Sequence, residues 1–231
     1  MPSAGDMPVR SLHIICSDAA RNGKSLIARL LADLMIMQGR DLLLLDCTGP
    51  QPTTAIHFPT ETQHLDLDRT TSMVTLFDTM LYSGRNHVVD LSAKHLDAFF
   101  NVVEEAGFLK EALNRNIDFN CDYIIDRSVN SFRNARAIWY TCDANFTPVR
   151  NLWAGSFANE KQVELTYQEM SEQGELVLPV ISAMLFRWLA VPGNEFRTAD
   201  DTPQRGQIRP PTDVFSLSSL MAKQFSTLGK I

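Results

Sequence analysis

Apolar residues recur along the chain in two alternating patterns, a short continuous run and a longer run at helical spacing. The first run, Leu12–Cys16, is followed after a polar turn by apolar residues at helical spacing from Leu26 to Met37, and a second run, Leu42–Leu45, ends at an acid. A strand without polar alternation is buried on both faces, which is typical of a parallel sheet covered by helices. The chain therefore begins with a predicted strand, helix and strand.

The alternation continues, with a helix predicted between each later strand and the one before it. We predict strands at residues 87–91, 121–126, 148–153 and 175–179, and helices at 72–82, 93–106, 131–141, 162–172 and 213–228. Residues 191–212 hold four prolines without periodicity and are predicted to form a loop. The pattern predicts an α/β fold of one domain, 1–231, with a doubly wound, mainly parallel sheet, helices on both faces, and ligands beyond the carboxyl ends of the strands.

Composition narrows the class of function. The chain has 21 Lys plus Arg against 27 Asp plus Glu, a net charge of −6 and no basic cluster, so we expect no specific nucleic-acid binding. No apolar run approaches the roughly 18 residues of a membrane span and no signal core is visible, so we expect a cytoplasmic protein without membrane contact. The four cysteines lack CxxC spacing, which argues against a disulfide framework or a zinc site.

Several apolar residues are expected to serve packing alone. The tryptophans lie in helical or strand patterns and are expected in the core: Trp139, Trp153 and Trp188. The helix at 213–228 has few basic residues beside its apolar face, so we expect it to dock on the protein body rather than on lipid. The side chains expected to be buried there are Leu217, Leu220 and Phe225.

The turn after the first predicted strand ends in Gly23-Lys24-Ser25. In a phosphate-binding loop, a glycine permits close backbone approach, a lysine binds the β- and γ-phosphates, and a hydroxyl binds Mg²⁺. The helix that follows directs its unpaired N–H groups and its positive end at the phosphates. We therefore expect nucleotide binding by the end of this loop: Ala20, Arg21, Asn22, Gly23, Lys24 and Ser25.

The loop resembles the variant phosphate-binding loop KGGxGK[ST] of the ParA/MinD family of ATPases. Gly23–Ser25 match that pattern, whereas Ala19 stands at the signature lysine, and Ala20 and Arg21 stand at the two glycines. Asp18 would face the phosphates unless its side chain turned away. A loop that keeps the fold without binding nucleotide is therefore an alternative.

Two further stretches are similar to the same family. Asp46 and Thr48 stand at the two acids of its switch sequence DxDPQ, and Asp90 ends a strand that looks like its Walker B segment. The resemblance implies phosphoryl transfer to water, with Lys24 on the phosphates and Ser25 on Mg²⁺. Asp46 or Asp90 would contact the water shell of the metal. Each acid can instead be a helix cap or a turn former.

The residues that differ from the family pattern affect the expected rate of ATP hydrolysis and the expected dimer. In the family, the signature lysine reaches the partner's phosphates across a nucleotide-sandwich dimer, which Ala19 cannot do; Arg21 either supplies that cation or is a surface residue. Thr48 replaces an acid that orients the attacking water, which implies slow hydrolysis or none. The resemblance also places Asn151 at the adenine edge, with a turn role as the alternative. The implied catalytic residues are Lys24, Asp46 and Thr48.

The resulting hypothesis is a ParA/MinD-like switch that binds ATP with Mg²⁺ and hydrolyses it slowly if at all. It would form a homodimer and position or segregate a cargo through a partition or transfer protein. One alternative is a pseudo-ATPase adaptor that acts through protein contacts only. Another is a small-molecule kinase, although no arginine-rich lid is recognisable in the sequence.

Overall fold

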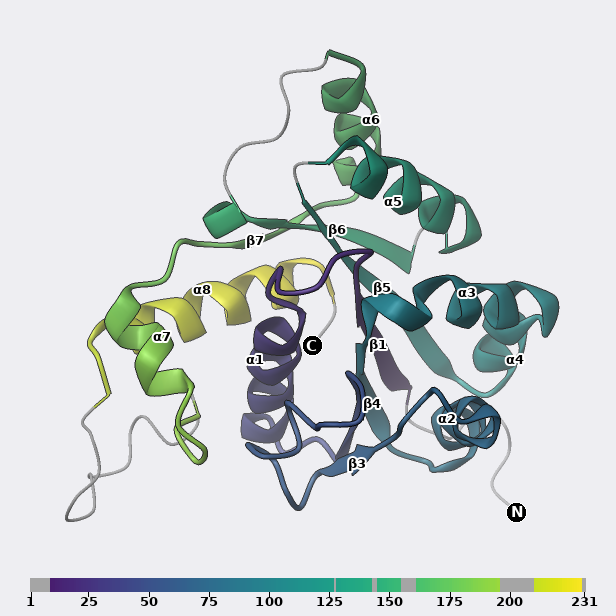
Figure 1. The fold of residues 1–231 in the computed structure, drawn as a ribbon, viewed down its shortest axis with the longest axis horizontal. Helices are drawn as coiled ribbons and strands as arrows, with labels where there is room; N and C mark the ends of the chain where they lie inside the picture. The colour runs from purple at the N-terminus through teal and green to yellow at the C-terminus, as the bar shows by residue number, and fades with distance from the viewer. Residues whose placement is uncertain (1–8, 127, 143–144, 155–160, 196–209, 230–231) are drawn as a thin grey trace.

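A parallel sheet with β1 at its centre organises the molecule. The computed structural model describes residues 9–126, 128–142, 145–154, 161–195 and 210–229. Within them, the strands are β1 (Arg10–Cys16), β2 (Leu42–Cys47), β3 (Thr62–His64), β4 (Asn86–Leu91), β5 (Ile117–Ile125), β6 (Phe146–Asn151) and β7 (Leu176–Leu178). Their order is β3-β2-β4-β1-β5-β6-β7, with every neighbouring pair parallel (Figure 1). The predicted parallel α/β sheet is confirmed.

Helices cover both faces of this sheet (Figure 1). One face carries α1 (Lys24–Met37), α7 (Ala183–Leu189) and α8 (Asp213–Thr227). The other carries α2 (Thr70–Tyr82), α3 (Leu96–Glu105), α4 (Phe108–Asn114), α5 (Val129–Cys142) and α6 (Lys161–Ser171). Two 3-10 turns, η1 (Ala93–His95) and η3 (Leu152–Ala154), follow β4 and β6. Alternate residues of β1 pack into two cores: Ile15 faces α1, and Ile14 faces the opposite helices. This explains why the strand is apolar throughout.

Three elements differ from the sequence prediction. β3 is short and polar, so it gave no strand signal, and it follows β2 without the helix that we expected between strands. The predicted helix at 93–106 is divided into η1 and α3, and Gly107, at φ +60°, separates α3 from the unpredicted α4. α7 was also not predicted. It is only seven residues long, too short for a clear period.

The C-terminal helix α8 packs on α1 and β7. Leu217 and Phe225 are buried as expected, but Leu220 is 41% exposed because it lies on the outer face of α8. The expectation of a buried Trp153 is also wrong, since this residue follows β6 in an exposed turn and is 56% exposed. The predicted loop 191–212 lies largely outside the described residues. No helix of the described segments has the length and apolar character needed to cross a bilayer.

Replacing Phe225 with alanine should destabilise the protein strongly. Phe225 is fully buried on α8, and truncation of a buried phenylalanine costs about 3–5 kcal/mol. The matched control is Phe215→Ala on the same helix, where the side chain is 45% exposed and a much smaller effect is expected. Chemical denaturation of both variants measures the difference. Equal losses would contradict the docking of α8 on the core.

Candidate functional site

The carboxyl ends of three strands meet the N-terminus of α1. The register pairs Ile15 of β1 with Asp90 of β4, and Asp90 with Asp46 of β2. Residues of one row across a parallel sheet point to the same face, and Ile15 packs on the α1 side. The fold therefore places both carboxylates on the face that α1 covers.

The turn between β1 and α1 has the backbone shape of a glycine-rich loop. Gly23 has φ +100°, and a Cβ added there would lie 3.1 Å from Asn151 Nδ2. Arg21 has φ +61°, a conformation uncommon outside glycine, at a position where the similar family has glycine. In the described part of the chain, no side chain caps the start of α1 and no acid occupies its first turn. The first N–H groups of α1 are therefore suited to an anionic ligand.

Lys24 is buried in this turn and bonds only to neutral acceptors there. Its Nζ donates to Ser17 Oγ at 3.1 Å and to the carbonyl oxygen of Ala19 at 2.5 Å, with Asn22 Oδ1 at 3.4 Å. Burial lowers the pKa of Lys24, and the charge of Asp90 opposes this shift. Hydrogen bonds between ionised groups are stronger than those to neutral acceptors. A phosphate would therefore compete well for this ammonium group.

The side chain of Asp18 is directed at α5. Asn134 Nδ2 donates to Asp18 Oδ2 at 3.2 Å, and the Asp18 backbone N–H donates to the hydroxyl of Tyr123 at 3.2 Å. The contact with Asn134 engages one carboxylate oxygen of Asp18 with α5, whereas the other, Oδ1, is buried without a hydrogen-bond partner among the described residues. Arg21 is exposed at the rim of the turn, so a cation is available two residues from Ala19.

Asp90 is a buried acid of the site. It is completely buried, and neither of its oxygens accepts a hydrogen bond of normal geometry from the described residues. The pKa of Asp90 is raised to about 7, and burial is the largest cause. The charge of Asp46 also raises this pKa, whereas the nearby hydroxyls of Ser25 and Thr53 and the charge of Lys24 oppose the increase. A buried carboxylate beside hydroxyl groups is a donor set that suits Mg²⁺, which prefers oxygen ligands. The residues present therefore fit the metal, which Ser25 and Asp90 would hold.

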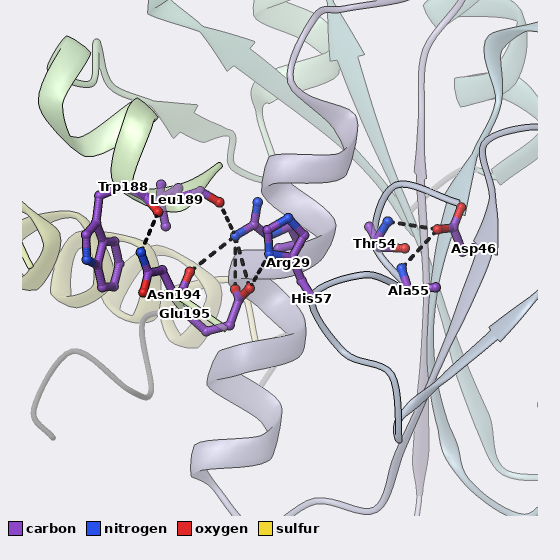
Figure 2. A network of polar contacts seen from close by, with 9 residues as sticks. All are labelled: Arg29, Asp46, Thr54, Ala55, His57, Trp188, Leu189, Asn194 and Glu195. Carbon is purple, nitrogen blue, oxygen red and sulfur yellow. Dashed lines mark hydrogen bonds and ion pairs between the residues drawn. The ribbon is translucent and has the colours of Figure 1, made fainter. Parts of the chain in front are cut away.

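Asp46 is engaged by the segment that follows β2. Its Oδ1 accepts hydrogen bonds from the backbone N–H of Thr48 at 3.2 Å and from the Thr48 hydroxyl at 2.6 Å. Its Oδ2 accepts the N–H groups of Thr53, Thr54 and Ala55 at 2.8–3.1 Å. Figure 2 shows the contacts with Thr54 and Ala55. Burial alone would raise the pKa of Asp46, but these hydrogen bonds hold it below its ordinary value. Asp46 is thus a turn former in this structure, and its role at a metal stays a prediction.

A series of hydroxyls joins Ser25 to Asp46. Thr53 Oγ1 lies 3.3 Å from Ser25 Oγ and donates to Thr48 Oγ1 at 3.1 Å, and Thr48 in turn donates to Asp46. We call residues 48–58 the hydroxyl loop. Sequence reasoning selected Thr48 but missed Thr53. The one signal for Thr53 was its position a few residues after the switch-like stretch.

Asn151 connects the turn to β6. Its Nδ2 donates to the carbonyl oxygen of Asn22 at 2.8 Å, and its Oδ1 accepts from the backbone N–H of Trp153 at 3.0 Å. The side chain is 9% exposed, and both ends of its amide already have protein partners. In the structure Asn151 holds the turn before α1. A base-reading role remains a prediction.

Solved structures with a similar architecture share little sequence with this chain. The MinD cell division protein of Aquifex aeolicus is 13% identical over 96% of this chain and 97% of its own, with a TM-score of 0.51. A chain of the MinC:MinD cell division protein complex of that organism is 12% identical over 94% of this chain and 96% of its own, with a TM-score of 0.53. A ParA family ATPase from Chlorobium tepidum TLS is 10% identical over 97% of this chain and 100% of its own, with a TM-score of 0.55.

The chain has the MinD/ParA fold. No family model matches the sequence, and no curated protein matches it either. Because the identities are only 10–13%, the likeness establishes the fold, and any activity has to be argued from the side chains of the site.

Proposed function

We propose that the protein is a nucleotide-dependent switch of the MinD/ParA type that binds ATP with Mg²⁺. The observation that carries this proposal is the buried carboxylate of Asp90 beside Ser25 and Lys24, which accepts no hydrogen bond of normal geometry from the described residues. It lies at a helix start that no side chain of the described residues caps. Lys24 would contact the phosphates, and Ser25 and Asp90 would hold the metal. Mg²⁺, when bound, neutralises charge on the phosphate oxygens.

We infer that any hydrolysis is slow. Ala19 offers no charge to a partner's nucleotide, and the Thr48 hydroxyl can orient a water molecule without taking its proton. Asp46 is a weak base, because the hydrogen bonds of the hydroxyl loop lower its pKa. The site is therefore built for binding more than for turnover.

Separate measurements of binding and turnover test this proposal. Titration with a fluorescent ATP analogue should show saturable binding. Phosphate release under single-turnover conditions should be on the order of 10⁻³ s⁻¹ or slower, as in unassisted phosphate-loop switches. Absence of binding would instead support an adaptor acting through protein contacts only, and phosphate transfer to a metabolite would support a kinase.

The proposed switch includes a homodimer, so Ala19→Lys should increase dimer formation with ATP. The new lysine would restore a charge at the position where the similar family carries one. Light scattering after size exclusion measures the dimer fraction. The double variant Ala19→Lys/Lys24→Ala is the control, since it should not bind nucleotide. Complete ATP-dependent dimerisation of the wild type would contradict a need for this lysine, and Arg21→Ala would then test the neighbouring cation.

A protein partner completes the proposal. One structural neighbour was solved as a MinC:MinD complex, which shows that this fold can present a surface to another protein. For this chain we propose a partner that belongs to a cargo, partition or transfer apparatus and distinguishes the nucleotide-bound state.

A further inference from the structure

Glu195 is a buried acid that bridges two elements of the candidate site. Its carboxylate contacts Arg29 of α1, with Nη2 at 3.1 and 3.2 Å from the two oxygens, and His57 of the hydroxyl loop, with Nδ1 at 2.7 Å from Oε1 (Figure 2). Glu195 is 0% exposed, Arg29 7% and His57 6%. Breaking a buried ion pair leaves an uncompensated charge and is strongly destabilising, so Glu195 and Arg29 are expected to stay together.

The chain after α7 folds back on Arg29. Besides Glu195, Arg29 Nη2 donates to the carbonyl oxygens of Leu189 at 2.8 Å and Asn194 at 3.4 Å. Asn194 Nδ2 closes the turn by donating to the carbonyl oxygen of Trp188 at 2.9 Å. Residues 189–195 are therefore anchored on the same helix whose first turn carries Lys24 and Ser25. This anchor lies 160 residues or more from Arg29 in the sequence.

The hydroxyl loop is fixed at two points that lie close together. Asp46 holds the backbone N–H groups of Thr53 and Thr54, and Glu195 contacts His57. A single turn connects the two points, because the Thr54 carbonyl oxygen accepts the His57 N–H at 3.0 Å. A shift of His57 would therefore be transmitted to Thr53, whose hydroxyl lies 3.3 Å from Ser25 Oγ.

We propose that Glu195 is a positioning residue for the hydroxyl loop, and that docking of residues 189–195 on α1 and binding of Mg²⁺ with nucleotide strengthen each other. The inference rests on the proposed nucleotide site. Arg29 and His57 give Glu195 one partner on the phosphate-loop helix and one on the loop that faces the metal residues. Coupling of this kind is reciprocal, so nucleotide should also tighten residues 189–195.

The test compares Glu195→Gln with the wild type and with a matched control, Glu111→Gln. Glu111 of α4 is paired with Arg115, the residue that follows this helix, with Nε to Oε1 at 2.6 Å. Helix α4 lies on the opposite face of the sheet from α1. Calorimetry gives the Mg²⁺ enhancement, defined as the ATP Kd in EDTA divided by the Kd in Mg²⁺. We expect Glu195→Gln to reduce this ratio about tenfold, with little change in the Kd in EDTA, and Glu111→Gln to leave both unchanged.

Hydrogen exchange supplies a readout that does not depend on activity. Mg²⁺ with ATP should slow exchange in both 48–58 and 189–195 of the wild type, and Glu195→Gln should speed exchange in 48–58. Should Glu195→Gln fail to fold, His57→Gln removes the loop contact while keeping the Arg29 pair, and the same loss of Mg²⁺ enhancement is expected.

The outcomes separate this inference from the function on which it rests. A wild type that binds no nucleotide in either buffer overturns the proposed function and the inference with it. A wild type with a clear Mg²⁺ enhancement that Glu195→Gln and His57→Gln leave unchanged overturns the positioning role alone.

Discussion

Replacing Lys24 with alanine is expected to weaken ATP binding by about 100-fold or more while the fold stays intact. Hydrogen bonds to charged groups contribute roughly 1.5–3 kcal/mol each, and a phosphate-loop lysine serves two phosphates. In the structure, Lys24 bonds only to neutral oxygens of its own turn. Its loss should therefore cost little of the folded structure. Titration with ATP measures the affinity, and circular dichroism checks the fold.

Lys94→Ala is the matched control for this variant. Lys94 is a largely exposed lysine paired with Asp68 at 2.5 Å and lies outside the phosphate loop. The Lys94→Ala variant should bind ATP as the wild type does. Unchanged affinity in Lys24→Ala would remove the assignment of the turn as a phosphate loop.

Replacing Asp90 with asparagine is expected to abolish the Mg²⁺ dependence of ATP binding. Asp90 is the buried carboxylate whose oxygens accept no hydrogen bond of normal geometry from the described residues, and an amide would not replace its charge toward a divalent cation. ATP titrations in Mg²⁺ and in EDTA should therefore give similar affinities for the variant. Asp118→Asn, in β5, is the control. Retained Mg²⁺ dependence in Asp90→Asn would contradict the metal site.

The same Asp90→Asn variant should be more stable than the metal-free wild type at pH 8. A carboxyl with an ordinary pKa of 3.8 and a pKa of about 7 in the folded protein binds its proton more tightly when folded. Its stability contribution is complete below about pH 4 and is lost as the pH rises through about 7, a change of about 4 kcal/mol. The amide that replaces this carboxyl does not titrate, so the variant does not lose this stability. Its free energy of unfolding should therefore exceed that of the wild type increasingly as the pH rises from about 4 to about 7. Thermal melts from pH 4 to pH 8 without metal would show it.

The pattern of apolar residues predicted the long buried strands but not the short elements β3 and α7. Leu12–Cys16 and Leu42–Leu45 are buried on both faces, so their continuous apolar runs could be recognised without any structure. β3 is three half-buried polar residues, and its strand character depends on pairing with β2. α7 shows no clear period because it covers about two turns.

The roles of the site acids depended on contacts that sequence does not display. Asp46 and Asp90 both end buried strands, and only the structure shows that the hydroxyl loop donates hydrogen bonds to Asp46, whereas Asp90 accepts none of normal geometry from the described residues. Glu195 meets Arg29 across 166 residues of sequence. No local pattern encodes such a contact, because it arises from packing of α1 against the segment that follows α7.

The most direct test of the central claim is a calorimetric titration of the wild-type protein with ATP, in Mg²⁺ and in EDTA. The arrangement of Lys24, Ser25 and Asp90 predicts one site per chain, with an affinity about tenfold or more higher in Mg²⁺. No saturable binding in either buffer, with ATP raised to roughly millimolar concentration, would contradict the claim that this loop is a nucleotide site.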